Sequence, residues 1–296
     1  MTGKPKLDVS SMRLPQNKMI ELDSVTMQWD KHVALQDVSL EVNEGDFIAI
    51  TGPNGGGKTT LLRLILRLIK PTSGKVIIDG EELFADKSRL RDIRFKVGLV
   101  FQYPEYQLFE ETVYKDISFG PKNMGLSEEE IDRRIRETCR LVGLKDEVLN
   151  KSPFDLSGGQ KRRVAIAGVM AMEPKVLILD EPTAGLDPHG RDRILGLIKE
   201  YHKEKKSTVM LVSHSMEDVA RTVSKILVMN DSRVFMYDTP ERVFAHSKEL
   251  TDMGLTVPQI TRVFDKLKEK GIDFDDEVYS VKYASELILK LLNKKG

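Results

Sequence analysis

Apolar and polar residues follow two different patterns along this chain, and the patterns predict two kinds of β-strand. Alternating apolar residues over 19–29 and 33–42 are typical of antiparallel strands. Nearly continuous apolar runs at 46–51, 175–179 and 208–213 indicate strands buried on both faces, as in a parallel sheet. Shorter apolar runs predict two further strands, at 76–79 and 97–101.

Segments with a helical period lie between these strands. Apolar residues recur every three or four positions in stretches that predict helices at 58–69, 127–142, 158–172 and 188–201. Ser127 and Glu130 fit a capping box at the start of the second helix, and Gly143 fits its C-terminal stop. Asp187 and Pro188 fit the N-cap and the first position of the last helix.

The alternation of strands and helices predicts an α/β protein with a parallel-sheet core, joined to an antiparallel β subdomain. The mostly helical stretch 104–172 interrupts the alternation, and we interpret it as a helical subdomain inserted into the core. After Asn230 the pattern changes to amphipathic helices at 258–270 and 283–292. The predicted division is a flexible N-terminal segment at 1–18, a main domain at 19–232 and a small C-terminal appendix at 233–296.

The two appendix helices carry apolar stripes with two possible uses. The stripes contact a partner chain, or they pack against each other as the appendix's own core. Their members are Ile260, Val263, Leu267, Leu287, Ile288 and Leu291.

Composition narrows the classes of protein to consider. The 296 residues contain 46 Lys plus Arg and 46 Asp plus Glu, so the net charge gives no general electrostatic attraction to nucleic acid. The basic run 203–206 could form a local patch, although a solvated loop explains it as well. Cys139 is the only cysteine, so no internal disulfide can form, and we interpret it as a packing residue.

No apolar run approaches the roughly 20 residues that a transmembrane helix needs. The first eighteen residues also lack the apolar segment of a secretory signal. If the protein acts at a membrane, we expect another chain to supply the membrane-spanning part.

The segment Gly52–Thr60 follows a predicted strand and precedes a predicted helix, and it fits the phosphate-loop pattern G-x-x-x-x-G-K-[ST]. Its glycines let backbone N–H groups approach phosphate oxygens, and the helix points its positive end at them. Lys58 is expected to reach the β- and γ-phosphates, and the Thr59 hydroxyl to hold Mg²⁺. The alternative, a plain glycine-rich turn, does not explain the position between strand and helix.

Two carboxylates end the apolar strand that begins at Val176. Asp180 at the carboxyl end of a buried strand suits a residue that organises Mg²⁺. Glu181 lies one residue further and is expected to face the γ-phosphate, where it can polarise an attacking water. An apolar strand ending in Asp-Glu is common, so this interpretation depends on the phosphate loop upstream.

The segment Leu156–Gln160 (LSGGQ) resembles the signature motif of ATP-binding-cassette (ABC) ATPases. The resemblance implies a P-loop NTPase (RecA-like) fold, and it implies that Ser157, Gly158 and Gly159 clamp the γ-phosphate of ATP bound to another subunit. The physical basis is again an anion at a helix N-terminus. The same residues also fit a simple helix cap.

Further positions follow the pattern of this family. Gln102 resembles the Q-loop glutamine, which contacts Mg²⁺ and water and links the site to a transmembrane partner, and Ala184–Asp187 resembles the D-loop at the dimer interface. His214 resembles the switch histidine near the γ-phosphate, although a lone histidine at a strand end is often structural. Trp29 matches the aromatic position that stacks on adenine, and packing is its alternative role.

The segment Phe101–Phe109 (FQYPEYQLF) resembles the Q-loop region of energy-coupling factor (ECF) transporter ATPases, the cobalt and vitamin importer type. Residues 113–120, 161–169 and 180–187 resemble the same group, as does Val257–Ile260 in the appendix. Within an ECF pair, the second of the two ATPases is the better match. The first eighty or so residues resemble ABC ATPases in general.

The resemblance implies ATP and Mg²⁺ as cofactors and a set of site residues. Implied catalytic residues are Glu181, His214, Lys58 and Gln102. Implied Mg²⁺ ligands are Thr59, Gln102 and Asp180. Implied nucleotide contacts are Trp29, Gly52, Pro53, Asn54, Gly55, Gly56, Gly57, Lys58, Thr59, Thr60, Ser157, Gly158, Gly159, Gln160 and Asp187.

The implied function is that of an ATP-hydrolysing subunit that energises import of a vitamin or transition-metal ion. The implied partners are a second ABC ATPase in a heterodimer, a transmembrane scaffold protein and a substrate-binding membrane protein, with no nucleic acid. The implied location is the cytoplasmic face of the cell membrane. The alternatives are an ATPase of another ABC importer, for metals or amino acids, or a soluble ABC ATPase of DNA repair or translation. The interval from Lys58 to Ser157 has no heptad run, and the chain has one cassette, which disfavours the soluble class.

Overall fold

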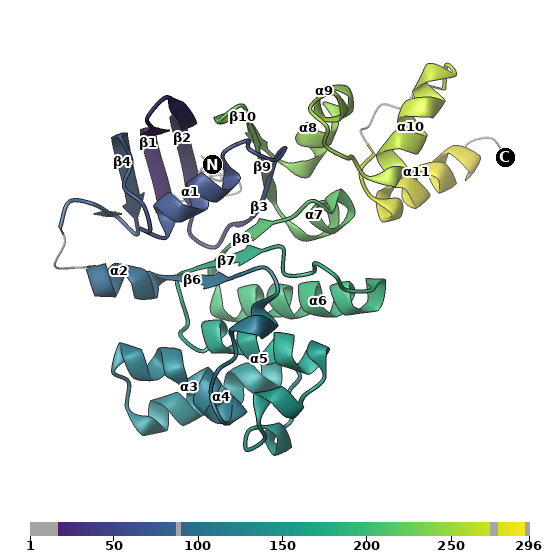
Figure 1. Cartoon of the computed structure of the whole chain (residues 1–296). Helices are drawn as coiled ribbons and strands as arrows, with labels where there is room; N and C mark the ends of the chain where they lie inside the picture. The colour runs from purple at the N-terminus through teal and green to yellow at the C-terminus, as the bar shows by residue number, and fades with distance from the viewer. Residues whose placement is uncertain (1–16, 87–89, 273–277, 294–296) are drawn as a thin grey trace, which may run out of the picture.

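The computed structural model describes residues 17–86, 90–272 and 278–293 (Figure 1). The strands are β1 (Lys18–Trp29), β2 (His32–Asn43), β3 (Phe47–Thr51), β4 (Ser73–Ile78), β5 (Glu81–Glu82), β6 (Val97–Val100), β7 (Val176–Asp180), β8 (Thr208–Val212), β9 (Lys225–Asn230) and β10 (Arg233–Asp238). The helices are α1 (Lys58–Ile65), α2 (Leu90–Lys96), α3 (Val113–Met124), α4 (Glu128–Leu141), α5 (Gly158–Met170), α6 (Pro188–Lys205), α7 (Met216–Thr222), α8 (Pro240–Phe244), α9 (Ser247–Asp252), α10 (Gln259–Glu269) and α11 (Val281–Asn293). Three short 3₁₀ helices accompany them, η2 (Pro104–Gln107), η3 (Asp146–Val148) and η4 (Pro153–Asp155).

The strands form two sheets, as the two hydrophobic patterns predicted. An antiparallel sheet has the order β2-β1-β4-β5, and a six-stranded sheet has the order β10-β9-β3-β8-β7-β6. Within the six-stranded sheet, β9, β3, β8, β7 and β6 are parallel. β10 pairs antiparallel with β9, so the predicted boundary at residue 233 falls between two paired strands of the core sheet.

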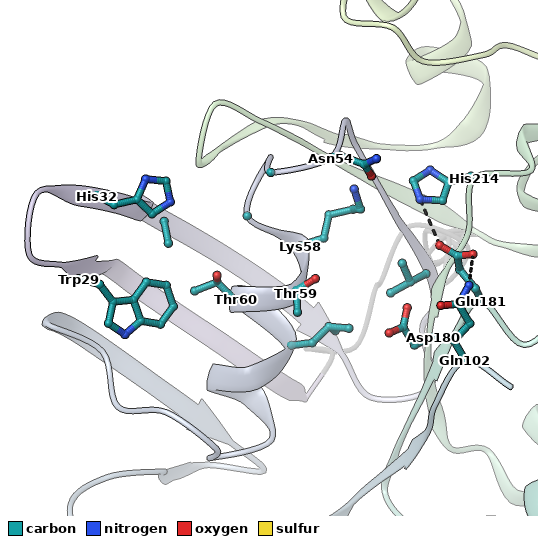
Figure 2. A pocket seen from close by; sticks show the side chains of 15 residues that line it. Trp29, His32, Asn54, Lys58, Thr59, Thr60, Gln102, Asp180, Glu181 and His214 are labelled. Carbon is teal, nitrogen blue, oxygen red and sulfur yellow. Dashed lines mark hydrogen bonds and ion pairs between the residues drawn. The ribbon is translucent and has the colours of Figure 1, made fainter. Parts of the chain in front are cut away.

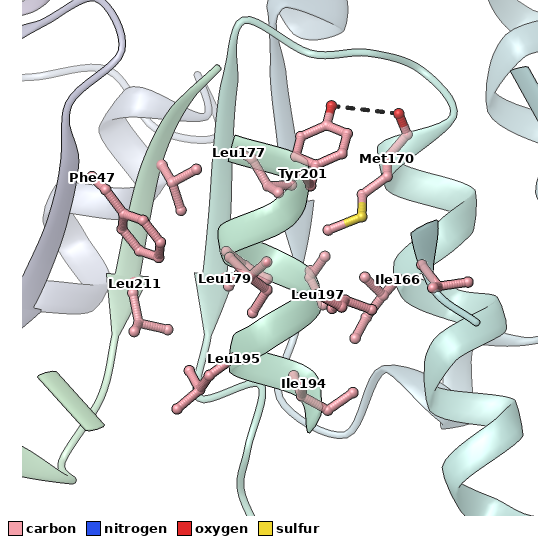
Figure 3. Packing of buried hydrophobic residues seen from close by; sticks show 14 of the residues in the cluster. Phe47, Ile166, Met170, Leu177, Leu179, Ile194, Leu195, Leu197, Tyr201 and Leu211 are labelled. Carbon is pink, nitrogen blue, oxygen red and sulfur yellow. Dashed lines mark hydrogen bonds between the residues drawn. The ribbon is translucent and has the colours of Figure 1, made fainter. Parts of the chain in front are cut away.

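The parallel sheet is buried on both faces because successive side chains of each strand point into different hydrophobic clusters. In β3, Ile48 and Ile50 pack toward α1 and the antiparallel sheet, whereas Phe47 and Ala49 pack toward α5 and α6. Figure 3 shows this second cluster, where Tyr201 of α6 lies against Met170 of α5 and donates a hydrogen bond to its carbonyl at 3.5 Å. The carboxyl ends of the strands are thereby held in fixed positions.

Helices α3, α4 and α5 fall within residues 104–172, the stretch interpreted as a helical subdomain, and they lie on the α6 side of the sheet (Figure 1). The appendix helices α10 and α11 lie at the opposite side of the core from α2, and they share a small cluster around Phe264, Val278 and Ala284. Ile260 and Leu287 pack against this cluster, while Val263 and Ile288 are exposed. The side chain of Leu291 lies outside the described residues. Within the described part of the chain, we find no helix whose length and apolar character would let it cross a bilayer.

Some helix ends differ from the predictions because residues other than glycine terminate the helices. The structure ends α1 at Ile65 rather than at 69, since Arg67 takes a left-handed conformation (φ 54°) and Leu68 N–H donates to the Arg63 carbonyl. Lys206 (φ 50°) ends α6 four residues beyond the predicted position in the same way.

The predicted capping box at Ser127 forms only in part among the described contacts. Ser127 Oγ accepts from Glu130 N–H at 3.3 Å, but the Glu130 carboxylate binds Arg133 and Arg134 instead of returning to the cap. The complete capping box is at Ser157 and Gln160, at the start of α5. This segment is the one that resembles the signature motif and also fits a simple helix cap.

Candidate functional site

The phosphate loop connects the buried strand β3 to α1, and its backbone is built to receive an anion. Gly57 (φ 102°) caps α1, and in this fully described helix no side chain bonds to the free N–H groups and no acidic residue lies in the first turn. The positive end of the helix dipole is therefore uncompensated. Gly52 (φ 148°) lies so close to β9 that a Cβ atom there would be 2.1 Å from the Met229 carbonyl oxygen.

Lys58 lies folded back over the loop that precedes it. Its Nζ donates to the carbonyl oxygens of Gly52 at 2.6 Å and Pro53 at 2.9 Å. Burial lowers the pKa of Lys58, and the charges of Glu181 and Asp180 partly oppose this shift. The ammonium group thus faces two carboxylates across the cavity, where a phosphate would give it a closer anionic partner.

Asp180 and Glu181 lie at the carboxyl end of β7. The phosphate loop follows β3 at the same end of the parallel sheet, and both line one cavity (Figure 2). Burial raises the pKa of Asp180, the Glu181 charge raises it further, and His214 and Lys58 oppose these effects. Glu181 has a left-handed backbone (φ 47°), which is uncommon for a residue other than glycine and which clusters at functional sites. Its N–H donates to the Val212 carbonyl at 3.0 Å, which ties it to β8.

Two side chains from different strand ends hold the Glu181 carboxylate. Gln102, after β6, donates from Nε2 to Glu181 Oε2 at 3.1 Å. His214, after β8, places Nε2 3.1 Å from Glu181 Oε1. Figure 2 shows these contacts as dashed lines on one side of the cavity. One carboxylate is therefore oriented by two neighbours and stays partly accessible, as a group that polarises water requires.

The opposite wall of the cavity comes from the antiparallel sheet. Trp29 ends β1 and is 41% exposed, and His32 begins β2 directly opposite it. Ala34 continues this wall toward the phosphate loop. His32 and Ala34 are not among the predicted site residues, although the short turn between two alternating segments could have indicated that His32 pairs with Trp29.

These elements enclose one cavity of about 320 Å³. The predicted residues that line it are Trp29, Asn54, Gly55, Lys58, Thr59, Thr60, Gln102, Asp180, Glu181 and His214, along with Gly57. Three other predicted contacts, Gly52, Pro53 and Gly56, are not among the described residues that line the cavity. They belong to the loop behind it.

The signature segment and Asp187 lie away from this cavity. Ser157, Gly158 and Gly159 are exposed at the N-terminus of α5, and Gln160 completes the capping box with Ser157. Asp187 caps α6, its Oδ1 accepting from Gly190 N–H at 2.6 Å. The structure does not bring these predicted nucleotide contacts to the cavity formed by the same chain.

Comparison with known proteins agrees with this architecture. A family model described as "ABC transporter" matches residues 35–184, about half of the chain. The chain belongs to the ABC transporter family. The energy-coupling factor transporter ATP-binding protein EcfA2 of Clostridium tetani is 54% identical over 264 residues, covering 89% of this chain and 92% of the relative. EcfA2 of Caldanaerobacter subterraneus is 52% identical, covering 88% of this chain and 91% of the relative.

Solved ABC structures support the same fold. The structure of cbiO1 from Clostridium perfringens, described as part of the ABC transporter complex cbiONQ, has a TM-score of 0.74 and 36% identity, and covers 84% of this chain and 100% of that one. A dimeric ATP-binding cassette in a post-hydrolysis state bound to ADP and Pi has a TM-score of 0.64 and 32% identity, and covers 75% of this chain and 99% of that one.

These comparisons assign the chain to the ECF branch of the ABC family and confirm the predicted P-loop NTPase fold. The protein is an ATPase subunit that energises ECF-type import. The alignment with the C. tetani relative spans 264 of the 296 residues, so it includes part of the first eighty residues.

Gly52 provides a test of how closely this ABC phosphate loop packs on β9. We expect Gly52→Ala to abolish ATP binding and to lower the free energy of unfolding by more than about 1 kcal/mol, because the loop must move away from Met229. Gly80→Ala is the matched control, since Gly80 also has a positive φ (74°) but has no atom within 4 Å of the added Cβ. Thermal unfolding and Trp29 fluorescence on adding ATP measure both effects, and unchanged ATP binding by Gly52→Ala would contradict the prediction.

Proposed function

We propose that this subunit pairs with a second, different ABC ATPase, and that each of two ATP molecules is enclosed between one chain's cavity and the other chain's signature. The observation that supports pairing is the division of the site within one chain. Lys58, Glu181 and His214 line the cavity, while Ser157 and Gly158 stay exposed elsewhere. A helix N-terminus open to solvent suits an anion brought by a partner. Two solved structures of a related ABC cassette are described as dimeric, which supports pairing as such.

Mg²⁺ fits the cavity on chemical grounds. Thr59, Gln102 and Asp180 offer hydroxyl, amide and carboxylate oxygens, the hard donors that Mg²⁺ prefers, and all three line the same space. The pKa of Asp180 is raised because its carboxylate is half buried beside the Glu181 charge, and a divalent cation bound there would stabilise the ionised form. Mg²⁺, when bound, would neutralise charge on the phosphate oxygens.

Each remaining role follows from the position of a side chain. Lys58 exchanges its two loop carbonyls for phosphate oxygens. Glu181 accepts a proton from the attacking water, and Gln102 and His214 keep its carboxylate oriented for that step. Trp29 offers an exposed ring at the far wall, on which a base can stack.

A second cavity, of about 290 Å³, is the proposed contact for a transmembrane scaffold protein. It lies between the segment after Gln102 and helices α3 and α5, and it includes Phe109 and Phe119, whose ring centroids are 5.0 Å apart. Both rings are about half exposed, and Tyr106 nearby is 84% exposed. Exposed aromatic residues around a groove are typical of protein interfaces. Because Gln107, Leu108 and Phe109 of its lining follow Gln102 closely in the chain, closure of the ATP site would move it.

The two ATPases are proposed to work within a larger assembly at the membrane. The scaffold would hold a small substrate-binding membrane protein, and the ATPases would sit peripherally at the cytoplasmic face of the membrane. The ligand would be a vitamin or a transition-metal ion. The relatives named EcfA2 support the second position in the ATPase pair. The exposed Val263 and Ile288 of the appendix are the proposed contacts with the other ATPase, while Ile260 and Leu287 serve the appendix core.

The test is to purify an affinity-tagged copy from detergent-solubilised native membranes and to identify co-purifying proteins by mass spectrometry. We expect a second ABC ATPase, a polytopic scaffold and a small membrane protein whose identity indicates the ligand. Recovery with a permease and an external binding protein would favour another ABC importer. Recovery of soluble partners alone would leave the ATPase chemistry and overturn the proposed assembly.

A further inference from the structure

The segments that carry Gln102, Glu181 and the signature helix meet at one buried guanidinium group. Arg162 lies on α5, five residues after Ser157, and it is 3% exposed. A buried arginine requires partners for its charge and its five N–H donors. Its partners come from two other parts of the chain, and both parts belong to the ATP site.

The first partner is Glu105, in η2, three residues after Gln102. Arg162 Nε donates to Glu105 Oε2 at 2.8 Å, and Nη2 donates to Oε1 at 2.6 Å. Burial opposes ionisation of Glu105, yet these two hydrogen bonds hold the pKa of its carboxyl below the ordinary value. A bidentate pair of this kind fixes orientation as well as charge. The backbone that follows Gln102 is thereby fixed to α5.

The second partner is the turn that follows Glu181. Arg162 Nη1 donates to the carbonyl oxygens of Ala184 at 2.8 Å and Pro182 at 3.3 Å. The same turn is closed by Ala184 N–H donating to the Glu181 carbonyl at 3.0 Å. The Arg162 contacts therefore brace the turn that presents Glu181 in its left-handed conformation.

Gln102 and Glu181 touch each other at 3.1 Å in the cavity, and Arg162 joins the two backbone segments directly behind them. We propose that Arg162 is a positioning residue that sets Glu181 and Gln102 in register with the signature helix, so that engagement of the partner's ATP by Ser157 aligns this chain's own carboxylate. This inference rests on the proposed function of Glu181 and of the signature.

Arg162→Lys tests the inference, because lysine keeps one positive charge but cannot reach Glu105 and two carbonyls in the same geometry. We expect kcat for ATP hydrolysis by the purified complex to fall about ten- to a hundredfold, as a small misplacement of catalytic groups would cause. We expect the KM for ATP and Trp29-reported ATP binding to stay within about twofold, because Arg162 does not line the cavity.

Arg134→Lys is the matched control. Arg134 is also a mostly buried arginine of the helical subdomain, with a side chain 14% exposed. It also binds a glutamate, Glu130, at 2.6 Å and a backbone carbonyl, that of Met172, at 3.2 Å. Its loss should lower the melting temperature much as the loss of Arg162 does, while kcat stays near that of the parent. Equal kcat in the two variants would overturn the inference.

Two further variants separate the possible failures. If Arg162→Lys does not fold, Glu105→Gln replaces it as the test, because this change removes only the charge of the pair. Parental kcat in Glu105→Gln would then overturn the inference. Glu181→Gln measured alongside should be inactive. Full hydrolysis by Glu181→Gln would overturn the proposed role of Glu181 together with this inference. An inactive Glu181→Gln beside a fully active Arg162→Lys would overturn this inference alone.

Discussion

Glu181→Gln is expected to reduce ATP hydrolysis by at least about a hundredfold and to leave ATP bound, because glutamine cannot accept the proton of the attacking water. The side chain keeps the same length, and its amide can still contact Gln102 and His214. We expect the free energy of unfolding to change by less than about 1 kcal/mol. Phosphate release measures the first effect, and retention of radiolabelled ATP measures the second.

The matched control is Glu41→Gln, at an exposed carboxylate of the antiparallel sheet whose partner is Lys18. It makes the same chemical change far from the cavity, so hydrolysis should remain at the parental rate. Parental hydrolysis by Glu181→Gln itself would show that another group activates water, and Asp180, the other carboxylate among the described residues that line the cavity, would be the next to test.

Ser157→Arg is expected to abolish hydrolysis by the paired ATPases while the isolated chain still binds ATP. Ser157 lies outside the cavity, so a bulky side chain there leaves the chain's own nucleotide contacts in place. The arginine would instead occupy the space where the partner's γ-phosphate is proposed to meet the N-terminus of α5. Trp29 fluorescence reports binding, and phosphate release by the purified complex reports turnover.

Ser127→Arg controls for the loss of the helix cap. Ser127 caps α4 through Glu130 N–H, as Ser157 caps α5 through Gln160 N–H. Each substitution should cost about 1 kcal/mol of stability through the lost cap. Only Ser157→Arg should stop hydrolysis, and equal turnover in the two variants would contradict the proposed role of the signature.

The phosphate loop shows why part of the site could be predicted from sequence. Its function depends on consecutive residues whose backbone conformations are local properties, such as the positive φ of Gly52 and Gly57. The strand before it and the helix after it were also predicted, because periodicity distinguishes buried strands from helices. The end of α1 was wrong by four residues, since Arg67 takes a conformation that sequence patterns associate with glycine.

The contacts that hold Glu181 could not be derived from spacing alone. Gln102 and His214 are separated from Glu181 by tens of residues, and they meet it because β6, β7 and β8 are adjacent in the sheet. The resemblance to ABC ATPases supplied their proposed roles, and the structure supplied their distances. His32 is a different case, because it lies only three residues after Trp29 and the short turn between the two strands could have indicated their pairing.

The sequence by itself determined strands β1 to β4 and β6 to β8, helices α1, α4, α5, α6, α10 and α11, the phosphate loop, and the cap that opens the signature helix. These features depend on side-chain periodicity and backbone preferences within a few residues. The tertiary structure decided that Asp180, Glu181, Gln102 and His214 share one cavity with Lys58, and that Ser157 lies outside it. It also decided that Arg162 joins the segments behind Gln102 and Glu181. These arrangements depend on which distant segments pack together. A buried arginine is strongly unfavourable unless its charge and N–H donors are satisfied, and Arg162 is satisfied only where Glu105 and the carbonyls of Pro182 and Ala184 converge on it.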